Sequence, residues 1–204
     1  MAMASKQELR QRQEEEQRQQ QLLRHQQRND ALIEAAKQGS LADIQSLLDR
    51  HADIDARDHN NSTPLHLASL NGNHQCIKFL LARHADIHAR ASNNTTPLHY
   101  ASFKGHHQCI EILLDRHADV NALANNNFTP LHHASKYGRP QCVEILLDRQ
   151  ADINARDNSQ FTPLHYASLN ANRRCIQNLL DYGADKSLIN VRLSLSQHMQ
   201  ASLS

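Results

Sequence analysis

The stretch Thr96-Pro-Leu-His-Tyr-Ala-Ser-Phe-Lys-Gly105 opens with the tetrapeptide that decides the fold of this chain. Thr-Pro-Leu-His occurs four times, beginning at Thr63, Thr96, Thr129 and Thr162, and each copy follows the last by 33 residues. Chance does not repeat a tetrapeptide at one fixed interval, so the chain is a tandem array. Because one unit of such an array cannot bury its apolar face alone, the units must stack into one continuous core.

Each copy leads into the same further pattern, which contains an apolar run ending in Leu-Leu and then Ala-Asp. In three of the four copies the pattern also contains a Gly, and in three of the four the Ala-Asp pair is followed by Ile or Val. In one unit these elements are Gly105, Ile110, Leu113-Leu114 and Ala118-Asp119-Val120-Asn121. A 33-residue period with this motif resembles the ankyrin repeat. The resemblance implies an all-α repeat solenoid, elongated and curved, in which helix–turn–helix units are joined by β-turn loops.

The array extends backwards, because the segment from Asp30 to Gly39 aligns with the Thr-led helix and puts Asp30 in the Thr position. Steps of 33 residues then define an ankyrin repeat domain over 25–189. Its five units are 25–57, 58–90, 91–123, 124–156 and 157–189. A Gln/Arg/Glu-rich N-terminal arm over 1–24 and a C-terminal segment over 190–204 lie outside it.

Local chemistry explains the boundaries within a unit. Thr caps a helix whose first position suits Pro, because the missing N–H of Pro has no partner there. Gly72, Gly105 and Gly138 permit a left-handed turn into the second helix, and Ala171 in the fifth unit predicts a strained turn. The loops between units are rich in Asn, which tolerates positive φ. These Asn residues are Asn60-Asn61, Asn93-Asn94, Asn125-Asn126-Asn127 and Asn158.

The two ends of the chain permit more than one interpretation. Residues 5–29 hold nine Gln, six Lys or Arg and four Glu, a composition that favours either a solvated helix or disorder. The alternative is an arm that binds a partner or forms a coiled coil, although its three Leu supply no heptad seam. In 190–204, Val191, Leu195, Met199 and Leu203 predict an amphipathic cap over the last repeat, with a C-terminal export signal as the alternative.

Composition excludes several classes of protein. A formal net charge of +1 gives no large field toward nucleic acid or membrane. No apolar run is long enough to span a bilayer, and the N-terminus lacks the apolar segment of a secretory signal. We therefore expect a cytoplasmic monomer, with the nucleus or a host cell's cytosol as alternative locations, and expect nucleic acid and membrane not to be partners.

The four Cys and fifteen His residues invite a metal or thiol interpretation, which the periodicity argues against. All four Cys, at 76, 109, 142 and 175, share one repeat position, and equivalent positions on stacked helices lie about 8–10 Å apart. That spacing is too wide for a disulfide or for two ligands of one zinc ion. We expect buried thiols, no metal, no cofactor and no enzymatic activity, since no catalytic constellation accompanies the repeats.

An Arg column recurs at the end of the second helix, at Arg50, Arg83, Arg116 and Arg149. One interpretation is structural, because a cation at a helix C-terminus interacts favourably with the helix dipole and an Asp adjoins three of the four. The other is a ladder of charge that binds an acidic ligand.

We expect the partner-binding face at exposed positions where the residue type differs from one repeat to the next. The resemblance implies recognition on the concave face, at the loop tips, the end of the first helix and the end of the second. Aromatic side chains beside Lys and Arg are typical of binding hot spots. The candidate residues are Leu70, Asn71, Arg83, Thr95, Phe103, Lys104, Arg116, Phe128, Lys136, Tyr137, Arg149, Phe161, Leu169 and Asn170.

These observations favour a non-enzymatic protein–protein interaction module, an adaptor, inhibitor or effector that binds through its concave face. The alternative is a binder of an acidic or nucleic-acid ligand through the Arg column and the basic arm. The resemblance also suggests Asn121 and Asn154 as targets of an asparaginyl hydroxylase, because each follows an acidic–aliphatic pair and a Leu eight residues upstream.

Overall fold

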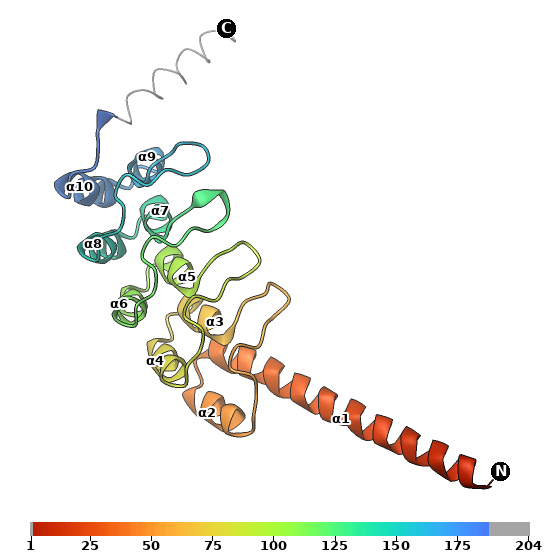
Figure 1. The fold of residues 1–204 in the computed structure, drawn as a ribbon. Helices are drawn as coiled ribbons and strands as arrows, with labels where there is room; N and C mark the ends of the chain where they lie inside the picture. Colours follow the sequence, from red (N-terminus) through yellow and green to blue (C-terminus); the bar gives the residue numbers. More distant parts are fainter. Residues whose placement is uncertain (1, 188–204) are drawn as a thin grey trace.

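The computed structural model describes residues 2–187, with side chains from residue 7 onward, and the expected C-terminal cap over 190–204 lies outside the described residues. Within residues 2–187, ten α-helices form two parallel rows that stack side by side (Figure 1). The first row is α1 (Ala2–Gln38), α3 (Pro64–Leu70), α5 (Pro97–Lys104), α7 (Pro130–Lys136) and α9 (Pro163–Leu169). The second row is α2 (Leu41–Asp49), α4 (His74–Ala82), α6 (His107–Asp115), α8 (Pro140–Asp148) and α10 (Arg173–Asp181).

Each first-row helix from α3 onward begins at the Thr-Pro pair, as predicted. Thr63 is the N-cap of α3, and Pro64 occupies the first helical position. The His three residues after the Thr completes a capping box, in which the Thr side chain faces the His backbone N–H and the imidazole faces the Thr backbone N–H. Two otherwise unpaired backbone donors are therefore satisfied at each helix start.

The glycines that follow the first-row helices have a left-handed backbone, with φ of 75° at Gly72 and 90° at Gly105. A side chain of the next repeat presses against each of them. A Cβ on Gly72 would lie 2.7 Å from the His106 ring, whose Nε2 bonds the Leu70 carbonyl at 3.1 Å. Ala171 adopts φ of 52°, so the strained turn predicted for the fifth repeat is present.

Between the two rows lies one continuous core of Leu, Ile, Val, Ala and Cys side chains. The four Cys are free and at most 2% exposed, which confirms the predicted burial. Burial raises the pKa of Cys109 and Cys142 to about 12, because a thiolate is poorly solvated there. Each thiol therefore acts as a small apolar side chain in the core.

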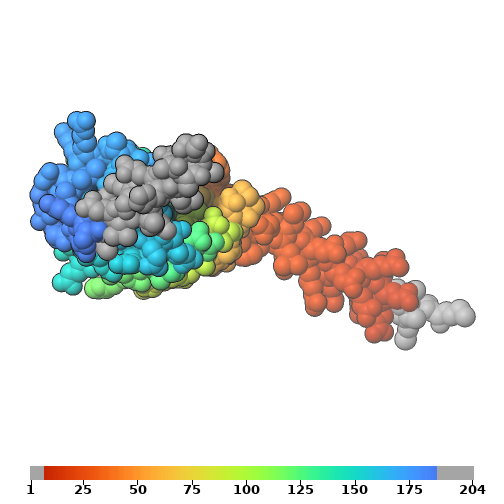
Figure 2. Space-filling view, turned by 90° about the horizontal axis from the view of Figure 1, so that it is seen from above, coloured from red at the N-terminus to blue at the C-terminus, as the bar shows by residue number. Residues whose placement is uncertain are grey.

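The N-terminal arm differs from the expectation at its boundary. No helix begins at Asp30, because α1 runs unbroken from Ala2 to Gln38 and contributes both the arm and the first helix of repeat one. The cap position is unnecessary in the middle of a helix, and Asn29 instead accepts a bond from the Asp53 backbone N–H at 2.8 Å. The arm is thus helical, and it projects from the stack as an extended rod (Figure 2).

Hairpin-like loops project beside the first row and are bonded to one another. Ser92 N donates to Asn60 O, Asn125 N to Asn93 O and Asn158 N to Asn126 O, each at 2.9–3.0 Å. Asn61, Asn94, Asn126 and Asn127 have positive φ, as their residue type predicts. In the fifth repeat, however, Gln160 takes that conformation with φ of 64°, and not Asn158.

A second series of bonds links successive repeats at the base of the loops. Asp55, Asn121 and Asn154 each accept a hydrogen bond from a backbone N–H of the following repeat, at Asp86, Asp152 and Asp185 respectively. The equivalent residue of the second repeat is His88, and no corresponding bond to Asp119 forms among the described residues. An imidazole at this position interrupts a ladder that a carboxylate or amide completes.

We therefore predict that His88→Asn stabilises the protein. The amide oxygen restores an acceptor for Asp119 N, and a net hydrogen bond contributes about 0.5–1.5 kcal/mol. Urea denaturation followed by circular dichroism measures the change, which we expect as a higher midpoint at unchanged slope. His88→Ala is the control, because it removes the ring without supplying an acceptor. Equal midpoints for the two variants would contradict the ladder.

The His residues of the tetrapeptide connect each repeat to the next. Thr63 N donates to His66 Nδ1 at 3.2 Å, and His66 Nε2 lies 3.0 Å from the Thr95 carbonyl of the following loop. A backbone N–H only donates and a carbonyl only accepts, so the ring is neutral with its proton on Nε2. Burial lowers the pKa of His66 to about 4 and of His99 to about 3, and it also lowers the pKa of His132.

These shifts predict acid sensitivity. The folded pKa lies below the unfolded value of about 6.5, so the unfolded chain binds more protons and stability falls as pH decreases from about 6.5 toward 4. The imidazoles of His66 and His99 each contribute a loss on the order of 1–2 kcal/mol at pH 5. Burial raises the pKa of Asp55, so protonation of this carboxyl group favours the folded state as pH falls, but Asp55 is a single group. Denaturation midpoints at pH 7.5 and 5.0 measure the effect.

The control for this prediction is His59→Gln, because His59 is exposed on a loop and its removal should leave the pH profile unchanged. His99→Gln should lower stability at pH 7.5 and reduce its dependence on pH. A midpoint that is constant or higher at pH 5.0 would contradict the neutral assignment of the histidines.

Candidate partner-binding site

A groove runs between the loops and the first-row helices of repeats three to five, with a volume of about 590 Å³. Aromatic and cationic side chains line its base, and Asn-rich loop tips line its rim. Its lining residues are Asn93, Thr95, Ala124, Asn125, Asn126, Phe128, His133, Lys136, Asp157, Asn158, Ser159 and Tyr166. Three of the predicted residues, Thr95, Phe128 and Lys136, are therefore brought together here.

The aromatic rings at the base of the groove are in contact with further rings beside it, across three repeats. Phe103 meets Tyr137 edge-on with centroids 4.5 Å apart, and Phe128 meets Tyr166 at 4.9 Å. His133 lies between the two pairs, 4.8 Å from Phe128 and 6.4 Å from Phe103. Edge-to-face pairs contribute about 0.5–1.5 kcal/mol beyond burial, so the rings hold one another in place. A preorganised surface of this kind loses little side-chain entropy on binding.

Lys136 lies over this surface. Its Nζ is 5.4–5.6 Å from the centroids of Phe128, Tyr137 and Tyr166, within the range of cation–π attraction. Lys104 stands over Phe103 at 5.0 Å. Neither lysine forms an ion pair within the described part of the chain. Two ammonium groups are thus held at the aromatic surface with no carboxylate partner of their own.

Two other side chains of the groove, Asp157 and His133, are held by neighbouring groups. Asp157 accepts bonds from Ser159 N and Phe161 N at 2.8 Å and from the Tyr166 hydroxyl at 2.6 Å. Desolvation lowers the pKa of His133 to about 4, so this ring is neutral near pH 7. The groove therefore presents apolar rings and the Lys136 ammonium group, while its carboxylate fixes the loop and Tyr166.

The other predicted residues lie around this centre or away from it. Phe161 contacts Tyr166 at 5.6 Å, which adds a second ring of repeat five to the cluster. Tyr137 is 42% exposed and Leu169 is 65% exposed, so both offer apolar surface beside the groove. Asn170 is also exposed and bonds the Tyr166 carbonyl. Leu70 and Asn71 end α3 in repeat two and do not line the groove.

The Arg column belongs to the second-row helices and none of its members lines the groove. Its partners also differ from the expectation, because the charge pairs join different repeats. Arg83 bonds Asp49 at 3.3 Å and Arg149 bonds Asp115 at 2.6 Å, each reaching back to the preceding repeat. Arg116 donates to the Leu81 carbonyl at 3.0 Å. These contacts assign Arg83, Arg116 and Arg149 a role in joining repeats.

Sequence reasoning did not select His133, Asp157 or Tyr166 for the site. A signal was available for His133 and Tyr166. They share a repeat position with Leu67 and Tyr100, so this position varies among the repeats while its neighbours do not. The role of Asp157 depends on bonds to its own loop, which a repeat pattern does not reveal.

Comparison with known families identifies the class of protein that this architecture defines. The model of the family described as ankyrin repeats, in three copies, matches residues 32–124 and 116–190. The chain belongs to the ankyrin repeat family, whose repeats generally act as protein–protein interaction modules. Comparison with curated proteins gives no significant match.

The described residues contain neither a membrane-spanning helix nor a group of metal-ligating side chains. No helix there is both long enough and apolar enough to cross a membrane. No three or more His, Cys, Asp or Glu side chains among these residues are grouped so that they could hold a metal ion.

The geometry separates recognition from stability, which predicts two classes of variant. Phe103→Ala and Tyr137→Ala should weaken partner binding by about thirtyfold, the effect of losing about 2 kcal/mol at a hot spot. Their free energies of unfolding should change by less than about 1 kcal/mol, since both side chains retain solvent contact. Leu113→Ala removes a fully buried side chain and should cost about 2–5 kcal/mol of stability.

Calorimetric binding and urea denaturation of the same samples separate the two classes. The aromatic assignment would be wrong if Tyr137→Ala unfolded as readily as Leu113→Ala while its folded fraction bound normally.

Proposed function

We propose that this protein is a non-enzymatic adaptor, inhibitor or effector that binds one protein partner in the groove of repeats three to five. The observation that carries the proposal is the continuous surface of Phe103, Phe128, Tyr137 and Tyr166 with Lys136 above it. Aromatic anchors beside a cation have the composition of interface hot spots. We also propose that it acts as a monomer in the cytoplasm, which is consistent with four free thiols.

The interaction function also agrees with how the groove is built. Its walls come from successive repeats that are bonded through their loops, so the surface is broad and rigid. Two of its polar side chains help to hold that surface: Asp157 is bonded three times and His133 is packed among rings. A protein side chain that places apolar surface on the rings and a polar group near Lys136 complements this arrangement.

The alternative, an acidic ligand held along the Arg column, is less well supported. Three of the four arginines are engaged with the preceding repeat, two with Asp side chains and one with a backbone carbonyl. A ligand that bridged them would have to displace these contacts. The column therefore supports repeat packing more directly than binding.

Site-specific photocrosslinking in cells that express the chain tests the proposed face. A benzophenone amino acid replaces Tyr137 in one sample and Tyr182 in another, since the two residues are similarly exposed, at 42% and 45%, on different rows of helices. We expect the probe at position 137 to form one discrete adduct that excess unmodified protein suppresses. Adding Phe103→Ala to the probe at position 137 should abolish that adduct. The same adduct from position 182, or none from position 137, would reject the groove as the binding face.

A further inference from the structure

Arg50 is the exception in the Arg column. It follows α2, where no earlier second-row helix lies beneath it, so the pairing used by Arg83 and Arg149 has no counterpart. Within residues 2–187 its guanidinium forms neither an ion pair nor a side-chain hydrogen bond. One charged group of the column is thus left available at the N-terminal end of the stack.

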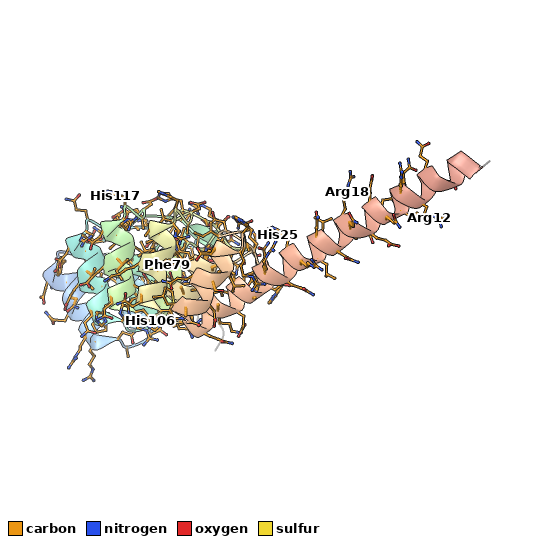
Figure 3. All side chains as sticks on the ribbon, turned by 90° about the horizontal axis from the view of Figure 1, so that it is seen from below. Arg12, Arg18, His25, Phe79, His106 and His117 are labelled. Atoms are coloured by element: carbon orange, nitrogen blue, oxygen red, sulfur yellow. The ribbon has the colours of Figure 1, made fainter. Side chains whose placement is uncertain are left out.

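The long helix α1 brings further arginines to the same place. A cleft of about 270 Å³ between α1 and α2 is lined by Arg24, Gln27, Arg28, Ala31, Leu47 and Arg50. No carboxylate lines it. The adjoining surface of α1 adds Arg18 and His25, with His25 near the stack and Arg18 further along the arm (Figure 3). Residues 17–29 contain three Arg and no Asp or Glu, so nothing in this segment neutralises them.

Arg28 gives independent support for an absent anionic partner. Its Nε is buried and has no hydrogen-bond acceptor among the described residues. Its NH2 group has one long contact, at 3.5 Å, with His25 Nδ1. A buried donor without an acceptor costs free energy, and gathering like charges in one cleft costs more. An oxyanion bound by these guanidinium groups would offset the repulsion between them.

The number of arginines selects the kind of anion. A guanidinium binds carboxylate or phosphate through paired N–H groups, but a carboxylate offers only two oxygens. A phosphomonoester offers three terminal oxygens and close to two negative charges near pH 7. Three arginines around one small cleft therefore match a phosphomonoester better than a single carboxylate.

The distribution of charge argues against a long polyanion. A nucleic acid needs basic residues spread along its path, because each phosphate carries one charge. Here the basic surface ends abruptly, since Glu14-Glu15-Glu16 precede Arg18 on the arm. The domain outside the arm carries no excess of basic residues either. A compact, doubly charged group fits this surface, and a nucleic-acid strand does not.

We propose that the cleft between α1 and α2 binds a phosphorylated side chain of a partner protein. Arg24, Arg28 and Arg50 hold the phosphate, and Gln27 supplies a further side-chain donor. Leu47 and Ala31 provide apolar contact for the chain that carries it. This site is separate from the groove of repeats three to five and does not depend on the function proposed for that groove.

Fluorescence polarisation with the full chain tests the proposal. The probe is a degenerate peptide library with one fixed phosphoserine, compared with matched libraries that carry Ser or Glu at that position. We expect saturable binding of the phosphoserine library only. Arg50→Gln and Arg24→Gln should each weaken it by about tenfold, as expected for losing one charge-assisted hydrogen bond. Arg173→Gln, at the exposed start of α10, is the matched control and should bind normally.

Competition identifies the chemistry that is recognised. Inorganic phosphate should displace the phosphoserine library more effectively than chloride at equal ionic strength. Equal binding of the Glu library would overturn the choice of phosphate, and tighter binding of single-stranded DNA would overturn the choice of a protein partner. Unchanged binding by Arg50→Gln, with folding verified by circular dichroism, would overturn the location.

Discussion

The structure depends on the imidazole that closes each Thr-Pro-Leu-His element. Its Nδ1 accepts from the Thr backbone at the helix start, and its Nε2 donates to a carbonyl in the next loop, as at His66 and Thr95. One neutral ring thus fixes where a helix begins and where the neighbouring loop stands. Because the bond recurs at His99 and His132, each loop in the middle of the array is positioned by the repeat before it.

The groove follows from this constraint. His99 holds the carbonyl of Phe128, and His132 holds that of Phe161, so the bonds that order the stack also set the backbone of one aromatic residue in the groove and one beside it. The Phe128 ring then lies between His133 and Tyr166 without belonging to the core between the two rows. Recognition surface and scaffold therefore use different side chains of the same loop residues, and substitution of the ring need not disturb the scaffold.

Much of this arrangement could be predicted from the sequence because the repeat supplies its own internal comparison. Helix starts, the left-handed turns and the buried Cys position follow from residues that recur at the same place in each unit. The side-chain contacts of the groove could not be predicted in this way. Phe103 and Tyr137 belong to different repeats, and their contact at 4.5 Å depends on how those repeats stack.

The first repeat differs from the others for a related reason. Its alignment put Asp30 where a helix cap belongs, but a cap is needed only if the chain turns there. The preceding residues are good helix formers, so the helix continues through the aligned position. The Arg column was likewise paired with neighbours in sequence, whereas Arg83 and Arg149 reach the Asp of the repeat before. In a solenoid, a charged side chain one repeat away in the sequence can be nearer in space than one on the adjacent residue.

The glycines that end the first-row helices are covered by side chains of the following repeat, so these contacts all run in one direction along the array. Gly72 and Gly105 are each covered by a side chain from the next unit, whereas the fifth unit has Ala171 at the same position. A further repeat with His, Arg or Asn at the covering position would collide with the Ala171 Cβ. The Ala171 methyl group thus occupies the space that the covering side chain of another standard unit would need. Lengthening this solenoid by such a unit would first require replacement of Ala171.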